Sequence, residues 1–198
     1  MLYTQMIIDV IDEQKKNQFI NGVDWSNSKF KNINDLVANN VGNVGEIIIN
    51  NICKNLNIES SIDGSKTKQI GGGYGDGKIK NRIVEVKTAR LGNNNTFQHE
   101  LGEHPWNAEF MCFVDVTPEN IYLSIIPNFS KDHYDKQSRT AEPYFNKSIT
   151  RRKEKSEENS GAFKLTINET DLKKSYHAII LNEKTPEEIK TFINSIIE

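Results

Sequence analysis

Two acids and one lysine at short spacing are the residues of this chain best suited to metal-assisted chemistry. Asp76 lies in a glycine-rich segment, and Glu85 and Lys87 follow it two positions apart within an apolar run. The β-branched neighbours favour a strand, on which residues i and i+2 point to the same face. Glu85 and Lys87 are therefore expected side by side, with Val84 and Val86 facing the core and Asp76 folded back beside the two charges. Two carboxylates and an ammonium group at one point suit a hard divalent cation and a polarised water.

A helix and a set of strands are expected to position these residues. Apolar residues recur every three or four positions over 34–56, which predicts a mostly buried helix with Glu46 as the lone acid in its middle. Gly42 and Gly45 in this helix predict close approach of another element. The other expected elements are a helix over 1–21, a connector over 22–32, a short helix over 96–102, strands near 61–62 and over 82–88, 109–117, 121–126 and 163–167, and a final helix from Thr185 to Ile197.

This order of elements predicts a single domain over 1–198 of the α/β (α+β) class, with a central mixed β-sheet flanked by helices. Within it, 1–32 is expected to be a helical appendage, and 128–160 a polar insertion. The chain has 198 residues, of which 36% are hydrophobic and 26% charged, as in globular domains.

Charge and apolar runs exclude several classes of function. The 25 basic and 27 acidic residues give a net charge of −2, which argues against a purely electrostatic nucleic-acid binder but allows a local basic groove. The two cysteines form no zinc-binding set. No apolar run approaches the ~20 residues that span a bilayer. We therefore expect a cytoplasmic protein with no membrane partner.

Two further motifs fail on spacing or context. The segment 72–78 matches most of a phosphate-binding loop, but Ile79 stands where a serine or threonine is needed, and no apolar strand precedes the segment. His99 and His104 are five positions apart, whereas a zinc-protease helix needs four, so they would lie about 140° apart on a helix. A surface turn is expected here, with Gln98 or His99 lying beside the predicted strand that carries Glu85 and Lys87.

The sequence resembles the PD-(D/E)xK nuclease superfamily, which includes many type II restriction endonucleases and a mismatch-repair nicking enzyme. The resemblance rests on Asp76, on Glu85-Val86-Lys87 and on the preceding helix with Glu46, and it covers roughly 36–126. It implies a restriction-endonuclease-like core. The order of the surrounding elements contributes more to the resemblance than the short motif does.

The first acid of the motif departs most from the family pattern. Gly75 stands where a proline is often found, and the eight residues of 77–84 are a short gap between the two acids. Asp63 is an alternative first acid. Asp76 is preferred because it directly precedes the strand pair that carries Glu85.

The resemblance implies a Mg²⁺-dependent, type II site-specific endonuclease that hydrolyses phosphodiester bonds in double-stranded DNA. Asp76, Glu85 and the Val86 carbonyl would hold the metal, Lys87 would orient the attacking water, and Glu46 would orient a metal-bound water. A homodimer and a cognate DNA methyltransferase in the same cell are the expected partners. The alternatives are a nicking, repair or phage recombination nuclease, and a non-catalytic DNA-binding module on the same scaffold.

Basic residues in two stretches could supply phosphate contacts, one around the predicted site and one within the polar insertion. A solvated surface is the alternative for any single member. The residues predicted to contact DNA are Lys78, Lys80, Arg90, Gln98, Arg151, Arg152 and Lys153.

Overall fold

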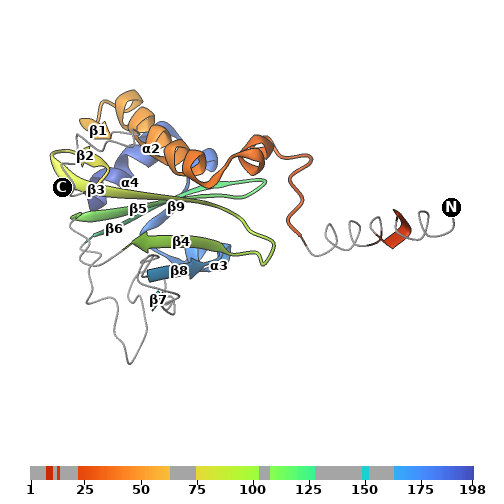
Figure 1. The fold of residues 1–198 in the computed structure, drawn as a ribbon. Coiled ribbons are helices and arrows are strands. Elements are labelled where there is room, and N and C mark those ends of the chain that lie inside the picture. The colour runs from red at the N-terminus through yellow and green to blue at the C-terminus, as the bar shows by residue number, and fades with distance from the viewer. Residues whose placement is uncertain are drawn as a thin grey trace.

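The fold is a mixed α+β arrangement built around one six-stranded sheet. The structure, a computed structural model, describes residues 8–10, 13, 22–62, 75–102, 108–127, 149–151 and 163–198. Helix α2 (Ala38–Asn55) covers one face of the central sheet, and a smaller three-stranded sheet lies against the other face (Figure 1). No helix within the described ranges is long and apolar enough to cross a membrane.

The central sheet is mixed, because one neighbouring pair of strands is parallel and the others are antiparallel. Its order is β1 (Ser60–Ile62), β2 (Gly77–Ile79), β3 (Arg82–Arg90), β5 (Phe110–Val116), β6 (Ile121–Pro127) and β9 (Ala178–Ile180), with β3 and β5 as the parallel pair. The antiparallel second sheet has the order β4 (Phe97–Gly102), β8 (Phe163–Ile167) and β7 (Ile149–Arg151). The remaining helices are η1 (Lys31–Asp35), α3 (Glu169–Lys174), η3 (Leu181–Glu183) and α4 (Pro186–Ile196).

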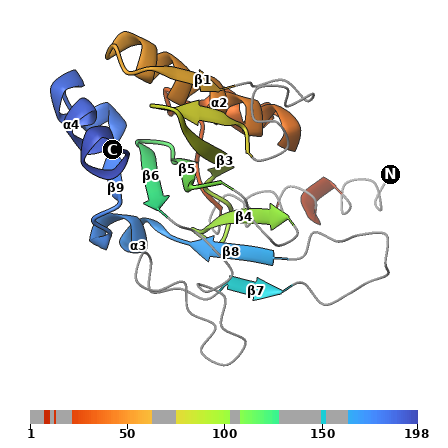
Figure 2. The ribbon, with the colours of Figure 1, turned by 90° about the vertical axis from the view of Figure 1, so that its left-hand side faces the viewer.

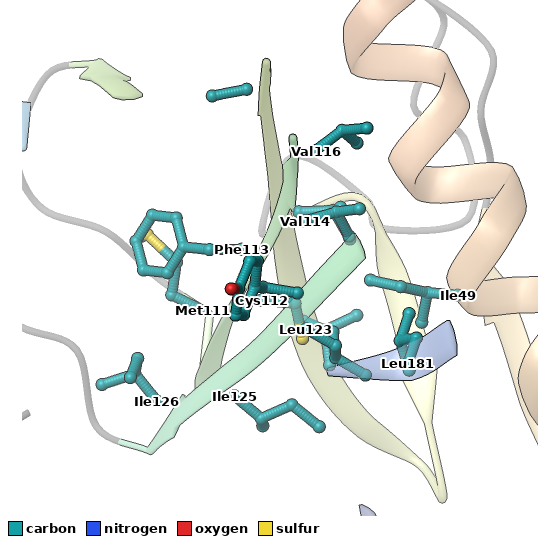
Figure 3. Packing of buried hydrophobic residues seen from close by; sticks show 14 of the residues in the cluster. Ile49, Met111, Cys112, Phe113, Val114, Val116, Leu123, Ile125, Ile126 and Leu181 are labelled. Atoms are coloured by element: carbon teal, nitrogen blue, oxygen red, sulfur yellow. The ribbon is translucent and has the colours of Figure 1, made fainter. Parts of the chain in front are cut away.

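The core lies on both faces of β5, all seven residues of which are buried. Met111 and Phe113 point away from α2, whereas Val114 points toward α2 and lies on the same side of the sheet as Ile49 of that helix (Figure 3). A strand covered on both faces is expected to be apolar throughout, as this one nearly is. Its one charged residue, Asp115, belongs to the site described below.

Helix α2 approaches β3 closely at one glycine. A Cβ at Gly45 would lie 2.0 Å from Thr88 Oγ1 and 3.2 Å from Val114 Cβ, so only a hydrogen atom fits between helix and sheet there. The Thr88 hydroxyl also donates a hydrogen bond of 3.2 Å to the Gly42 carbonyl. The close approach predicted for both glycines is confirmed at Gly45, whereas a Cβ at Gly42 would meet nothing within 4 Å. The contact at Gly45 sets the distance between α2 and β3.

Gly45→Ala should lower the free energy of unfolding by about 1–3 kcal/mol, because the added methyl group overpacks the contact with Thr88. Gly42→Ala is the matched control on the same helix, since nothing lies within 4 Å of the added Cβ. That variant should be stabilised by up to about 1 kcal/mol, since alanine favours the helix. Urea unfolding of both variants checks the pair, and equal effects would contradict the packing argument.

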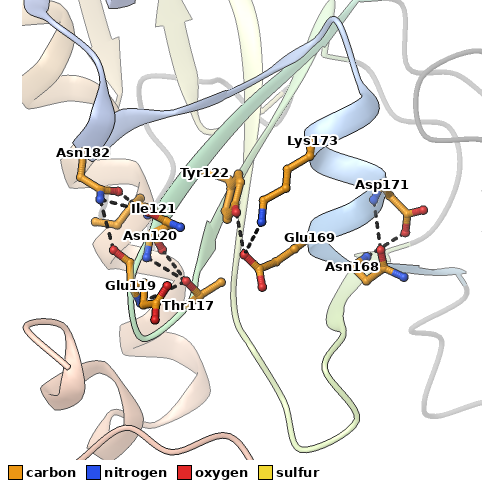
Figure 4. Close-up of polar contacts among 10 residues, drawn as sticks. All are labelled: Thr117, Glu119, Asn120, Ile121, Tyr122, Asn168, Glu169, Asp171, Lys173 and Asn182. Atoms are coloured by element: carbon orange, nitrogen blue, oxygen red, sulfur yellow. Dashed lines mark hydrogen bonds and ion pairs between the residues drawn. The ribbon is translucent and has the colours of Figure 1, made fainter. Parts of the chain in front are cut away.

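Polar contacts stabilise the part of the central sheet around β6, away from β3. The Tyr122 hydroxyl donates a hydrogen bond of 2.6 Å to Glu169, which joins β6 to α3 (Figure 4). Burial, and then the bond to Glu169, raises the pKa of Tyr122 well above its usual value. Helix α4 begins where the sequence predicts, and a capping box at Thr185 and Glu188 stabilises its start.

The strand predictions over 82–88, 109–117, 121–126 and 163–167 are confirmed, whereas the short helix predicted over 96–102 is wrong. That segment is strand β4, and its burial has the period of a strand. Phe97, His99 and Leu101 are buried, while Gln98 and Glu100 between them are exposed. The helix predicted over 1–21 lies largely outside the described residues.

Candidate active site

The candidate site lies at the open edge of strand β3. Strand β2 pairs with β3 only from Arg82 to Val84, while β5 pairs with the opposite edge as far as Arg90. Among the described residues, no strand pairs with β3 beyond Val84 on the β2 side. Helix α2 and strand β4 flank this edge from opposite sides of the sheet (Figure 2).

Asp76 is fixed against this open edge by two hydrogen bonds to β3. Its backbone N–H donates to the Val84 carbonyl at 2.8 Å, and its Oδ2 accepts from the Val86 N–H at 2.7 Å. The side chain is almost fully buried, with 1% exposed. Since N–H and C=O of one strand residue point to the same side, the Val86 carbonyl is also expected to face this edge.

The glycines on both sides of Asp76 are required by its position. Gly75 and Gly77 have φ angles of 135° and 157°, which side chains rarely adopt. A Cβ at Gly75 would lie 2.5 Å from the Val84 carbonyl oxygen, and one at Gly77 would lie 2.2 Å from that of Ser61. The glycine-rich sequence therefore allows the chain to bring Asp76 against β3.

Glu85 and Lys87 lie side by side on β3, as the spacing predicts. The Lys87 ammonium forms an ion pair with Glu85 Oε1, and the two side chains are 23% and 19% exposed. Val84 and Val86 on the opposite face are buried in the core. The ion pair holds the ammonium group on the side of the sheet that faces β4.

One cavity of about 690 Å³ brings most of the predicted catalytic residues together. Glu46 from α2, Asp76, and Val86 and Lys87 from β3 all line it. Glu85 is joined to the lining of the cavity through its ion pair with Lys87. The helix acid, the turn acid and the lysine come from three separate segments, as the sequence predicts.

His99 lines the cavity on the side of β4, and it forms a buried pair with Asp115 that the sequence analysis did not predict. His99 Nε2 lies 2.9 Å from Asp115 Oδ1, and both side chains are 0% exposed. The imidazole also packs against Phe113, with 4.6 Å between ring centroids. Burial raises the pKa of Asp115, and the nearby His99 partly opposes that rise. His99 is thus no part of a surface turn, and the pair attaches β4 to the centre of the main sheet.

The residues predicted to contact DNA are dispersed in the structure. Lys80 Nζ donates to the Ile197 carbonyl at 2.8 Å, and Arg90 Nη1 donates to the carbonyls of Ile33 and Leu36 at 2.7 and 2.8 Å. These contacts favour a structural role for both residues. Lys78 is exposed on β2.

Gln98 is exposed and lines the cavity, beside the strand of Glu85 as expected. The backbone of Arg151 lies in β7, and Arg152, Lys153 and the alternative acid Asp63 lie outside the described residues. Lys164 of β8 also lines the cavity and was missed. Its alternation with the buried Leu165 was the only sequence signal that it faces outward.

The donors at the cavity fit a hard divalent cation. Within the described ranges, no three side chains of histidine, cysteine, aspartate or glutamate are grouped closely enough to hold a metal by themselves. Mg²⁺, however, is usually bound by one or two carboxylates, with waters and substrate phosphates as its other ligands. Asp76 and Val86 line the cavity, and Glu85 lies beside it through its ion pair with Lys87, so two carboxylates and a backbone carbonyl are oxygen donors of that kind. Comparison of the chain with protein-family models, curated protein sequences and solved structures gave no match.

Proposed function

We propose that this chain is a Mg²⁺-dependent, restriction-type endonuclease of the PD-(D/E)xK superfamily that hydrolyses phosphodiester bonds in double-stranded DNA. One observation carries the proposal: Asp76, Lys87 and Glu46 line one cavity at the open edge of β3. A charged hairpin with no chemical role would not be expected to bury its first acid against the strand that carries its lysine. A short symmetric target site would call for a homodimer, and a cognate methyltransferase would protect that site in the cell.

In this mechanism each residue has a separate task. Asp76, Glu85 and the Val86 carbonyl would hold Mg²⁺, which when bound polarises the phosphodiester and lowers the pKa of a water ligand. Lys87 donates hydrogen bonds to the attacking water and to the charge that develops on the phosphoryl oxygens. Glu46 faces the same cavity from α2 and accepts a hydrogen bond from the water, which orients it for attack.

Incubation of the protein with plasmid DNA and Mg²⁺, with EDTA in a parallel reaction, tests the proposal. Discrete fragments that disappear with EDTA support a site-specific endonuclease. Nicked circles would indicate a nicking or repair enzyme. DNA binding without cleavage in Mg²⁺ or Mn²⁺ would show a binding module and overturn the proposed activity.

Lys87→Ala should lower the cleavage rate by about 10²–10³-fold, which is typical of losing one donor that stabilises developing charge. Binding of the same duplex in Ca²⁺ should change little, because Lys87 is assigned to chemistry. Lys54→Ala is the matched control, since that lysine is exposed at the end of α2 and lies outside the cavity. Single-turnover cleavage measures both variants, and wild-type rates for Lys87→Ala would show that the catalytic assignment is wrong.

A further inference from the structure

The active-site cavity continues into a second cavity along the same edge of β3. The second cavity has a volume of about 590 Å³ and shares Ala38, Thr88 and Gln98 with the first. Its walls are the start of α2, the end of β3 and the turn that leads into β4. At ~3.3 Å per strand residue, the four steps from Val86 to Arg90 cover about 13 Å. We call the two cavities together the edge groove.

The charged side chains of the edge groove lie mainly in the first cavity, whereas the polar side chains of the second are mostly amides and hydroxyls. Among the described residues that line the second cavity, Arg90 is the one charged residue, and its guanidinium is bound to backbone carbonyls. Within the described part of the chain, the amides that line the groove make no hydrogen bond through their side chains. Each amide offers two donors and one acceptor. The amides are Asn39, Asn43, Asn93, Asn94 and Gln98.

The turn between β3 and β4 holds two of these amides in a fixed position. Leu91 before the turn and Phe97 after it are buried, and the Leu91 N–H donates to the Val116 carbonyl at 2.8 Å. Inside the turn, the Gly92 N–H donates to the Thr96 carbonyl at 3.0 Å. Asn93 and Asn94 therefore lie at a hydrogen-bonded tip between two anchored strands. Such preorganisation suits the recognition of a ligand by directional hydrogen bonds.

The composition of the second cavity favours bases over phosphates as its ligand. Phosphates are held mainly by lysine and arginine. Among the described residues that line the second cavity, the one cation is Arg90, and its guanidinium is already bound to backbone carbonyls. Asparagine and glutamine, by contrast, pair in a bidentate manner with N6 and N7 of adenine in the major groove. A length of about 13 Å corresponds to about four base pairs at 3.4 Å each.

We propose that the edge groove receives the base edges next to the scissile phosphate, and that Gln98, Asn93 and Asn94 recognise adenine there. The inference rests on the proposed endonuclease activity and adds the determinant of its sequence preference. A single bidentate contact discriminates between bases by about 5- to 150-fold. Adenine is therefore preferred at positions within about four base pairs of the cut.

Sequencing of the ends cut from a random duplex pool in Mg²⁺ tests the inference. The wild type should prefer adenine near the cut, and Gln98→Ala and Asn94→Ala should each relax that preference by about 5- to 150-fold at one position. Asn51→Ala, at an exposed amide of α2 outside the groove, is the matched control and should leave the preference unchanged. Because all three side chains are exposed, the variants should unfold at the temperature of the wild type.

A chemical probe gives a second measurement on unmodified protein. Replacing the preferred adenine with 7-deazaadenine removes the N7 acceptor, so it should slow the wild type but not the variant that has lost the matching amide. Cleavage with no adenine preference, or with one that both variants retain, would overturn the inference and leave the endonuclease standing. Failure of the wild type to cut any DNA would overturn the proposed function, and the inference with it.

Discussion

Under the proposed function, Asp76→Asn should reduce Mg²⁺-dependent DNA cleavage by about 10³-fold or more while the protein remains folded. A bound metal contributes several kcal/mol to stabilising the transition state, and each 1.36 kcal/mol is tenfold in rate. The asparagine carbonyl can still accept the hydrogen bond that the Val86 N–H donates at 2.7 Å to the wild-type carboxylate. The substitution therefore removes the charge and preserves the contact that fixes the turn.

Single-turnover cleavage and calorimetric titration with Mg²⁺ measure the two effects of Asp76→Asn separately. Both the rate and the metal affinity should fall, whereas thermal unfolding should change little. Asp35→Asn is the control for loss of one negative charge, because Asp35 is exposed in η1 and lies outside the cavity. If Asp76→Asn cuts within tenfold of the wild type, Asp63 becomes the first acid, and Asp63→Asn is the variant to test next.

Asp115→Ala should lower the free energy of unfolding by about 3–5 kcal/mol, the largest stability effect that we expect from a single substitution. Its carboxylate lies 2.9 Å from His99 Nε2 with both side chains 0% exposed, so its removal leaves a buried imidazole without its partner. The same pair joins β4 to β5. The loss should therefore reach the wall of the edge groove as well as the core.

Guanidinium chloride unfolding of Asp115→Ala and of a double variant, His99→Phe with Asp115→Val, checks this prediction. Apolar residues of similar volume can replace both partners of a buried polar pair with little loss, so the double variant should recover most of the stability. A cost below about 1 kcal/mol for Asp115→Ala would contradict the role assigned to the pair. Additive losses in the double variant would show that the two residues act independently.

Local sequence patterns were sufficient to predict the segments that carry the candidate site. The β-branched run of β3, the spacing of Glu85 and Lys87, and the helical period of α2 all reflect local geometry that neighbouring residues fix. The position of Asp76 could also be predicted from the sequence, because the adjacent glycines permit backbone angles that other residues rarely adopt. These features therefore needed no knowledge of tertiary contacts.

The opposite wall of the site depends on contacts between distant segments, which local patterns do not contain. His99 is buried because β4 packs across β5, and β4 is a strand because β8 pairs with it through registers such as Gln98 with Thr166. Pro105 follows this segment, and a proline at that place is equally compatible with the end of a helix. The alternation of Phe97, His99 and Leu101 was the better signal, although a buried histidine made it hard to recognise.

The connection between the parallel strands β3 and β5 has a consequence for the order in which the protein acquires its activity. The chain between these strands includes β4, and β4 finds its partner in β8, more than 60 residues further along the chain. During synthesis, N-terminal segments emerge first, so Asp76, Glu85 and Lys87 leave the ribosome well before β8 can complete the wall opposite them. Under the proposed function, a prematurely terminated chain that lacks β8 would carry every motif residue and still be harmless to the DNA of its host.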